Sequence, residues 1–147
     1  MVLKVAIASD HAGFALKEFL KEKFDSLDAE WVDLGTDGPD SVDYPDFGYK
    51  VADYVAGGRA PFGVAICGSG IGISIAANRN PKVRAALCRD SNMAALSRQH
   101  NDANVLCLGE RLTPPEEALE ILRTFLTTDF EGGRHAARVE KLGKETR

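Results

Sequence analysis

The residues with the clearest chemical potential occupy positions 67–72, which read Cys-Gly-Ser-Gly-Ile-Gly. Cys67 ends an apolar run, and the glycines introduce a stretch of small residues that is typical of a helix start. Backbone N–H groups at such a start attract anions, favour a thiolate over a thiol and can hold an oxyanion. We therefore expect a reactive thiol beside an anion site. The alternative is a glycine turn next to a small buried side chain.

Common phosphate-binding and phosphatase motifs do not match this segment. Counted from Gly68, the dinucleotide-binding pattern G-x-G-x-x-G needs a glycine where Ile73 stands. A Walker loop needs a lysine, and a cysteine-dependent phosphatase needs an arginine soon after its cysteine. Positions 68–75 hold neither residue. The segment therefore predicts anion binding outside the common nucleotide and phosphatase patterns.

Histidine occurs three times, as His11, His100 and His135. The spacing of these residues matches no metal-binding motif, so the sequence predicts no metal site. His11 follows the first apolar run, and His100 precedes the last one within Arg-Gln-His-Asn-Asp. Because an imidazole titrates near neutral pH, Cys67 and His100 are candidates for a base and an acid. The alternative for each histidine is a structural role.

Arg134 and Arg138 are four residues apart, so one helical face would carry two guanidinium groups. Such a like-charged pair is unfavourable unless an anion binds it. Together with Arg111, which follows the last predicted strand, they are candidates for a phosphate clamp through paired hydrogen bonds. The alternative is a solvated face on which Glu131 and Glu140 neutralise the arginines.

Alternating strand and helix patterns must position these residues. Apolar runs predict strands at residues 3–8, 30–34, 62–67, 83–88 and 104–108. Amphipathic or small-residue stretches predict helices around residues 16–24, 47–55, 73–78, 91–100 and 114–125. A polar segment, residues 131–147, follows the last of these helices.

Local signals define the start of two helices and the exposed face of one. Ser9 or Asp10 is expected to cap the first helix. Thr113 and Glu116 form a capping box with a proline at the first helical position of the last helix. The charged residues of the first helix that are expected to face water are Lys17, Glu18, Lys21 and Glu22.

Nearly continuous apolar strands indicate a sheet that is covered on both faces. The alternation with helices then predicts an α/β fold, a Rossmann-like three-layer sandwich with a five-stranded parallel sheet. Ligands of such folds bind at the carboxyl ends of the strands. That edge would hold Asp10, His11, Cys67 and the glycine loop. Residues 35–45 form a long loop of the kind that often contributes to a site.

The composition excludes several classes of function. With 147 residues, 44% hydrophobic and 27% charged, the chain has the size of one globular domain, residues 1–147. A net charge of −4 disfavours nucleic acid as a partner. No apolar run approaches the ~20 residues of a membrane span. Three cysteines without a CxxC pair indicate no disulfide framework, so we expect a cytoplasmic protein with Cys88 and Cys107 in its core.

Five segments together resemble the ribose-5-phosphate isomerase B family, within a wider group that includes galactose-6-phosphate isomerase subunits. They occur in the order found in the family and are spread over nearly the whole chain. The segments are Ser-Asp-His-Ala-Gly-Phe at 9–14, Asp-Tyr-Pro-Asp at 43–46, Ile-Cys-Gly-Ser-Gly-Ile-Gly-Ile-Ser at 66–74, Arg-Gln-His-Asn-Asp-Ala-Asn-Val-Leu at 98–106 and Glu-Gly-Gly-Arg-His-Ala-Ala-Arg-Val at 131–139.

This resemblance implies an aldose–ketose isomerase that interconverts ribose 5-phosphate and ribulose 5-phosphate without a cofactor or a metal. It implies that Cys67 is the base that moves a proton between C1 and C2 through an enediolate. His100 would be the acid that opens the furanose ring. The residues implied to bind the sugar phosphate are Asp10, His11, Tyr44, Gly68, Ser69, Gly70, Ile71, Gly72, Asn101, Arg111, Arg134 and Arg138.

The resemblance also implies a homodimer, or a dimer of dimers, whose active sites are shared between subunits. The segment 131–147 would then reach the partner subunit. It has little apolar material for a core of its own and carries two arginines at helical spacing. Both properties fit a segment that binds to a neighbouring chain.

Two positions define where the chain stands in the family. Ser69 replaces a threonine found in many members and keeps the hydroxyl. Some relatives use a nearby acidic residue as the base instead of the cysteine, but no Asp or Glu lies between Cys67 and Lys82. We therefore expect the cysteine type. The same cysteine argues against the galactose-6-phosphate branch.

Two other functions stay open at this point. One is the isomerisation of a six-carbon sugar phosphate such as allose 6-phosphate, or of a free rare sugar, which the width of the 35–45 loop would decide. The other is a non-catalytic regulator that binds a phosphosugar. The intact Cys67 and His100 count against a regulator.

Overall fold

The computed structural model describes residues 2–144 and contains a five-stranded parallel sheet in the order β2-β1-β3-β5-β4. The strands are β1 (Leu3–Ser9), β2 (Ala29–Asp33), β3 (Phe62–Cys67), β4 (Ala85–Leu87) and β5 (Val105–Gly109). The helices are the 3-10 turn η1 (His11–Gly13), α1 (Phe14–Lys23), α2 (Tyr44–Ala56), α3 (Ile71–Ala77), α4 (Ser91–Asn101), α5 (Pro115–Thr127) and α6 (Arg134–Leu142). The predicted α/β class is confirmed.

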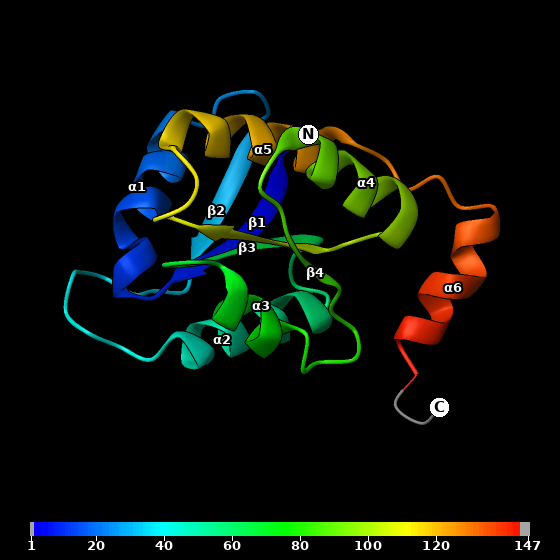
Figure 1. Cartoon of the computed structure of the whole chain (residues 1–147), viewed down its shortest axis with the longest axis horizontal. Helices are drawn as coiled ribbons and strands as arrows, with labels where there is room; N and C mark the ends of the chain where they lie inside the picture. Colours follow the sequence, from blue (N-terminus) through cyan, green and yellow to red (C-terminus); the bar gives the residue numbers. More distant parts are fainter. Residues whose placement is uncertain (1, 145–147) are drawn as a thin grey trace.

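Helices cover both faces of the sheet, so the molecule has three layers (Figure 1). Helices α1, α4 and α5 pack on one face, and α2 and α3 pack on the other. Helix α6 lies outside these layers, beside the end of α4. Among residues 2–144 no helix is long and apolar enough to cross a membrane.

Successive residues of the central strands point into different layers. On β3, Val64 and Ile66 belong to the core under α1, α4 and α5, whereas Ala65 and Cys67 belong to the core under α2 and α3. Burial on both faces accounts for the continuous apolar runs in the sequence. It also fixes the side of the sheet on which the Cys67 sulfur lies.

Strands β1, β3 and β5 end next to one another. Ser9 pairs with Ile66, and Cys67 pairs with Gly109. The segments that follow these strands therefore begin at the same edge of the sheet. Asp10 begins one of them, and its carboxylate accepts a hydrogen bond from the N–H of Gly13 at 3.1 Å. Asp10 is thus a helix cap, as predicted, although the element that it caps is η1.

Lys17 is buried, which corrects the prediction that it faces water. Its side chain is 1% exposed, and Nζ donates a hydrogen bond to Asp33 Oδ2 at the end of β2, at 2.6 Å. Lys21 Nζ binds the same oxygen at 2.7 Å. Burial raises the pKa of Asp33, but hydrogen bonds from Lys17, Lys21 and the Gly35 amide outweigh it, so the pKa is lowered overall. The hydrogen bonds from Lys17 and Lys21 to Asp33 join α1 to β2.

Two helix starts differ from the sequence prediction. Helix α5 begins at Pro115 without a side-chain cap, and Thr113 is buried. Its hydroxyl has no hydrogen-bond partner within the described residues, so the predicted capping box is wrong. Helix α2 begins at Tyr44, ahead of the predicted start near residue 47, because Pro45 is compatible with the first turn of a helix.

Candidate active site

A cavity of about 520 Å³ opens at the carboxyl edge of the sheet, where the fold class predicts a ligand site. Its walls come from the segments after β1, β3 and β5 and from the start of α2. The lining residues are Asp10, His11, Ala12, Tyr44, Cys67, Gly68, Ser69, Ile71, Gly72, Arg111 and Leu112. All of them except Ala12 and Leu112 were singled out from the sequence.

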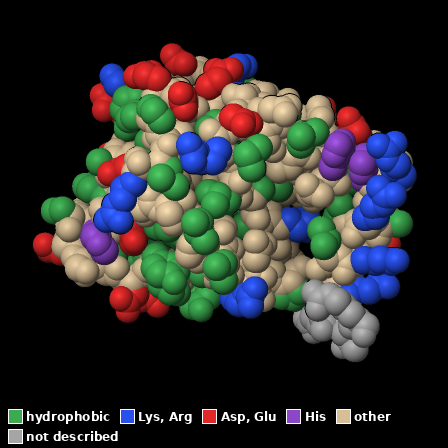
Figure 2. Space-filling model, viewed as in Figure 1, with side chains coloured by type: hydrophobic (Ala, Val, Ile, Leu, Met, Phe, Trp, Pro, Cys, Tyr) green, Lys and Arg blue, Asp and Glu red, His purple; other side chains and the backbone are tan. Residues whose placement is uncertain are grey.

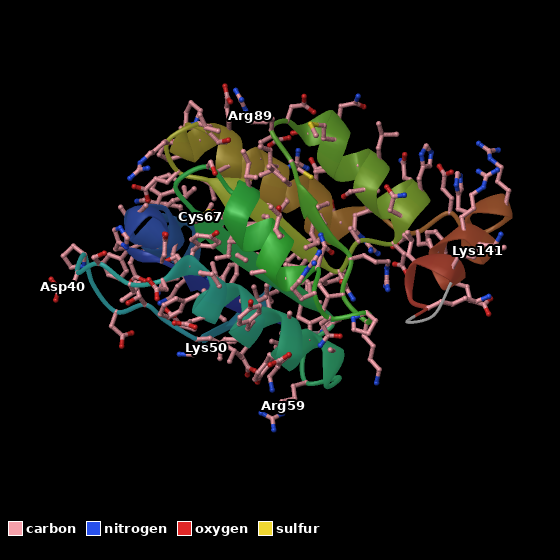
Figure 3. The ribbon with its side chains drawn as sticks, turned by 60° about the horizontal axis from the view of Figure 1, so that its bottom comes forward. Asp40, Lys50, Arg59, Cys67, Arg89 and Lys141 are labelled. Carbon is pink, nitrogen blue, oxygen red and sulfur yellow. The ribbon has the colours of Figure 1, made fainter. Side chains whose placement is uncertain are left out.

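Cys67 is the last residue of β3 and is 5% exposed. The N–H of Gly70 donates a hydrogen bond to its sulfur at 3.2 Å. Gly70 has a left-handed backbone conformation, with φ 79°, and directly precedes α3. Figure 3 shows Cys67 at the passage from β3 to α3. The sulfur thus has a hydrogen-bond donor beside it at the wall of the cavity.

The loop after Cys67 lies tightly against β5. A Cβ atom at Gly109 would come within 2.4 Å of the Ser69 backbone. A Cβ atom at Gly70 would come within 2.5 Å of Leu87 and 2.9 Å of the Leu108 backbone. Glycine at both positions therefore permits the close approach by which β5 supports the Cys67 loop.

His11 connects the cavity to the long loop between β2 and α2. The N–H of Val42 donates a hydrogen bond to His11 Nδ1 at 3.1 Å. A neutral His11 imidazole therefore carries its proton on Nε2. The neighbouring Asp10 is 6% exposed and is held by Gly13. These contacts fix the wall of the cavity that faces the loop.

Tyr44 and Arg111 lie over the glycines of the Cys67 loop. A Cβ atom at Gly72 would meet the Tyr44 ring at 2.5 Å, and one at Gly68 would meet Arg111 Nη1 at 2.9 Å. Arg111 brings a positive charge to the cavity. Leu112 adds an exposed apolar wall that the sequence did not indicate, because it lies in an irregular turn after β5 where no periodicity marks it.

The other predicted site residues lie elsewhere: they are His100, Asn101, Arg134 and Arg138. Among the described residues, none of these lines the Cys67 cavity. Helix α4 ends at Asn101, just before β5 begins, whereas Cys67 pairs with the last residue of β5. A strand of five residues spans about 16 Å. Figure 3 shows Cys67 and Lys141 of α6 on different sides of the molecule. Within one chain, Cys67 and His100 therefore do not form the expected base–acid pair.

Asn101 borders a second cavity, of about 820 Å³, at this other end of the molecule. The loop between α3 and β4 and the end of α6 form its walls, including Arg84 and Leu142. It contains neither a thiol nor a histidine among its lining residues. The chemistry predicted for Cys67 therefore has no counterpart in this cavity.

Arg134 and Arg138 are exposed on α6, one helical turn apart. Within residues 2–144 neither forms a salt bridge with Glu131 or Glu140, so these carboxylates do not neutralise the pair. Figure 2 shows Lys and Arg side chains gathered at this end of the molecule, next to two histidines. Residues 145–147 of the predicted partner-binding segment lie outside the described residues.

His100 and His135 stack where α6 meets α4. Their ring centroids are 4.3 Å apart and the rings are inclined by 15°. Glu131 lies beside both rings, with Oε1 3.6 Å from His135 Nε2 and 3.9 Å from His100 Nε2. Burial lowers the pKa of His135, and the neighbouring His100 and Arg134 lower it further. The sequence did not group these three residues.

Cys88 and Cys107 are buried in the core, as predicted. All three cysteines are free. Burial raises the pKa of Cys88 to about 11 and also raises that of Cys107, so both are thiols at neutral pH. Of the three, Cys67 is the one that lines the cavity at the carboxyl edge.

Comparison with known proteins gives one consistent result. The family model described as Ribose/Galactose Isomerase matches residues 5–142. Ribose-5-phosphate isomerase B of Escherichia coli is 44% identical over 139 residues, which is 95% of this chain and 93% of that protein. The structure of ribose-5-phosphate isomerase B from Clostridium thermocellum is 52% identical, with a TM-score of 0.90 and coverage of 96% of this chain and 95% of that one. The Mycoplasma genitalium enzyme with bound ribulose-5-phosphate is 43% identical, with a TM-score of 0.92 and 98% of both chains covered.

Proposed function

Because this chain belongs to the ribose/galactose isomerase family, we propose that it interconverts ribose 5-phosphate and ribulose 5-phosphate. The observation that carries the proposal is the Cys67 sulfur, held by the Gly70 N–H at the wall of the cavity. Aldose–ketose exchange requires a base that moves a proton between carbons and donors that stabilise an enediolate. The Cys67 loop is able to supply both.

In this mechanism the Cys67 thiolate takes the proton from C2 of the open-chain aldose and returns it to C1. Backbone N–H groups of residues 68–72 stabilise the negative oxygen of the enediolate. Two of these N–H groups are engaged within the loop, since Gly70 binds the Cys67 sulfur and Ile71 binds the Ser69 hydroxyl oxygen. The absence of Asp and Glu between Cys67 and Lys82 supports the thiolate as the base.

We further propose a homodimer, or a dimer of dimers, in which one subunit completes the cavity of its neighbour. The completing part is the edge of the sheet at which the strands begin. The separation of Cys67 from His100 within one chain supports this arrangement. So do the exposed apolar side chains of Ile71 and Ile75 on α3 and of Leu142 on α6, because exposed apolar surface near a site is typical of an interface.

Each proposed site then draws on two chains. One chain contributes Cys67, Asp10, His11, Tyr44 and Arg111. The partner subunit contributes His100, which opens the furanose ring, and Asn101, which binds the sugar. Its Arg134 and Arg138, unpaired by carboxylates within the described residues, join Arg111 in holding the phosphate. Phosphate binding remote from the reacting carbons orients the substrate for proton transfer.

We also propose that the protein works in the cytoplasm. Its candidate base is a free thiol, and thiols persist in reducing compartments. The cavity is sized for a small molecule, which fits a sugar phosphate as the substrate.

The test is an isomerase assay on ribose 5-phosphate, allose 6-phosphate, galactose 6-phosphate and free ribose, with the Cys67→Ala variant as control. We expect kcat/KM for ribose 5-phosphate to exceed the other values by at least about tenfold. A preference for a six-carbon or unphosphorylated sugar would overturn the proposal that ribose 5-phosphate is the substrate. Binding of ribose 5-phosphate without turnover of any sugar would instead support a regulator.

A further inference from the structure

His100, Glu131 and His135 bring three metal-ligating side chains to one point outside the Cys67 cavity. One ligand atom from each lies within 4.8 Å of the other two. They come from three segments: the last turn of α4, the linker between α5 and α6, and the first turn of α6. The sequence does not reveal the group, because 30 residues lie between His100 and Glu131 in the chain and only the fold brings them together.

The spacing of these atoms suits ligands around one ion better than direct hydrogen bonds. Glu131 Oε1 lies 3.6 Å and 3.9 Å from the two Nε2 atoms, beyond the 2.7–3.2 Å range of N–H···O bonds. Around a tetrahedral Zn²⁺ with bonds of roughly 2.0–2.1 Å, neighbouring ligand atoms lie about 3.4 Å apart. The observed spacing is slightly wider than that value, and the two stacked rings must turn toward each other for both nitrogens to reach one ion.

Part of the group is held in place, and part of it is open. The N–H of Glu131 donates a hydrogen bond to the carbonyl of Gln99 at 3.1 Å, which ties the linker to the end of α4. His135 is 7% exposed and stacks on His100. The side chains of His100 and Glu131 are 40% and 52% exposed. An ion therefore has a fixed wall on one side and access from solvent on the other.

The donor set selects the kind of ion. Two imidazoles and one carboxylate suit Zn²⁺ and similar transition metals, whereas Mg²⁺ and Ca²⁺ prefer oxygen ligands. Arg134 and Arg138, on the same helix as His135, oppose any cation by charge. The single carboxylate of Glu131 offsets only part of that charge. The favourable free energy of ion binding must therefore come from the imidazole–metal bonds. This again favours Zn²⁺ over the hard cations.

We propose that His100, Glu131 and His135 form a three-ligand site for Zn²⁺ or a similar divalent transition-metal ion, with a fourth position left for water. The ion is a regulator and takes no part in the isomerisation. This consequence rests on the proposed function: a bound ion occupies His100 Nε2, so His100 cannot open the furanose ring, and zinc inhibits the enzyme.

Binding is tested directly by calorimetric titration of the metal-free protein with ZnCl₂ and by the visible absorption of bound Co²⁺. We expect one ion per chain. Glu131→Gln and His135→Gln should weaken binding by at least about tenfold. Glu140→Gln, which removes an exposed carboxylate from α6, should bind zinc as the unaltered protein does. Cys67→Ala should also keep its affinity, because the thiol is not a ligand of this site.

Three results would overturn the metal site: no binding at millimolar zinc, equal affinity in Glu131→Gln and the unaltered protein, or loss of binding in Cys67→Ala. Glu131 is exposed, so its variant decides the matter even if His135→Gln fails to fold. The titration needs no substrate. Zinc binding without isomerase activity would leave the metal site standing and remove the proposed function, whereas isomerase activity without zinc binding would do the reverse.

Discussion

In the proposed mechanism, no side chain near position 67 can replace the sulfur of Cys67. Asp10, the buried carboxylate of the cavity wall, is engaged by Gly13, and the loop from Gly68 to Pro81 carries no acid. Cys67→Ala should therefore fold and bind ribose 5-phosphate while kcat falls by at least about a thousandfold. Steady-state kinetics and calorimetric binding measure the two effects.

Cys67→Ser serves as a second variant at this position. A serine hydroxyl is far less acidic than a thiol, so this variant should be nearly as poor as Cys67→Ala although it keeps the polar atom. Near-normal turnover in either variant would show that another group moves the proton.

His100 acts, in the proposed mechanism, on the closed ring and not on the carbon acid. Ribose 5-phosphate must be opened before it reacts, whereas ribulose 5-phosphate cannot form a five-membered ring because its O5 carries the phosphate. His100→Asn should therefore slow turnover of saturating ribose 5-phosphate much more than that of ribulose 5-phosphate. Equal losses in the two directions would assign His100 to the proton transfer itself.

At the scale of elements, the hydrogen bonds from Lys17 and Lys21 to Asp33 join α1 to β2. Asp33→Asn leaves the buried ammonium of Lys17 without its closest anion, so it should destabilise the fold by about 1–3 kcal/mol at neutral pH. The lowered pKa of Asp33 sets the pH dependence. Its contribution is fully present above the unfolded-state pKa and is lost as pH falls through the lower, folded-state pKa.

Urea unfolding at several pH values checks this expectation. The difference in free energy of unfolding between the unaltered protein and Asp33→Asn should be constant near neutral pH and should shrink below about pH 4. Asp37→Asn, an exposed carboxylate in the following loop, is the matched control and should change little. A difference independent of pH would attribute the effect to packing and not to charge.

Strand β5 and the Cys67 loop also depend on each other. Gly109→Ala would place a Cβ atom 2.4 Å from the Ser69 backbone, and a backbone cannot turn aside as a flexible side chain can. We expect a loss of about 1–3 kcal/mol in stability and at least about a tenfold loss in kcat/KM as the loop shifts. Gly38→Ala has open space around its Cβ and should do neither. Unchanged activity in Gly109→Ala would mean that the loop position does not matter for turnover.

The elements themselves could largely be predicted from the sequence, because strands buried on both faces and amphipathic helices have local patterns. Residues 62–67 were predicted as a strand and form β3. Lys17 could not be assigned in this way, since it lies on α1 and its partner Asp33 lies at the end of β2. Thr113 was misassigned because a capping sequence does not reveal that its hydroxyl is buried. Local sequence patterns thus locate helices and strands, whereas contacts between these elements determine the burial and the partners of individual side chains.

The same distinction holds for the candidate site. Cys67 ends a strand, and Asp10 and His11 follow one, so the rule for parallel sheets places all three at one edge. The stacking of His100 on His135 depends on where α6 packs, and no periodicity encodes that position. Sequence pattern alone also does not tell how many chains are needed to bring a Cys67 and a His100 into one site.

At the scale of the whole molecule, mixed dimers of two variants test whether each site is shared between subunits. Neither Cys67→Ala nor the double variant Arg134→Ala/Arg138→Ala should be active alone. In a heterodimer of the two, one site has its thiol and both arginines, and symmetry gives the other site both defects. If subunits mix freely, about half of the dimers are heterodimers, so roughly a quarter of the unaltered activity should return. Absence of recovery in a sample with proven heterodimers would mean that each chain supplies its own arginines.

The unequal surroundings of the three cysteines have a practical consequence for the molecule as a whole. Cys88 and Cys107 are enclosed in the core as protonated thiols, whereas Cys67 borders a solvent-connected cavity. A small electrophile such as iodoacetamide therefore meets one sulfur per folded chain, and the amount of label counts the sites in a preparation without any substrate. A larger electrophile that reacts with the same atom would occupy the cavity lined by Tyr44 and Arg111, which makes this cysteine a suitable attachment point for covalent inhibitors.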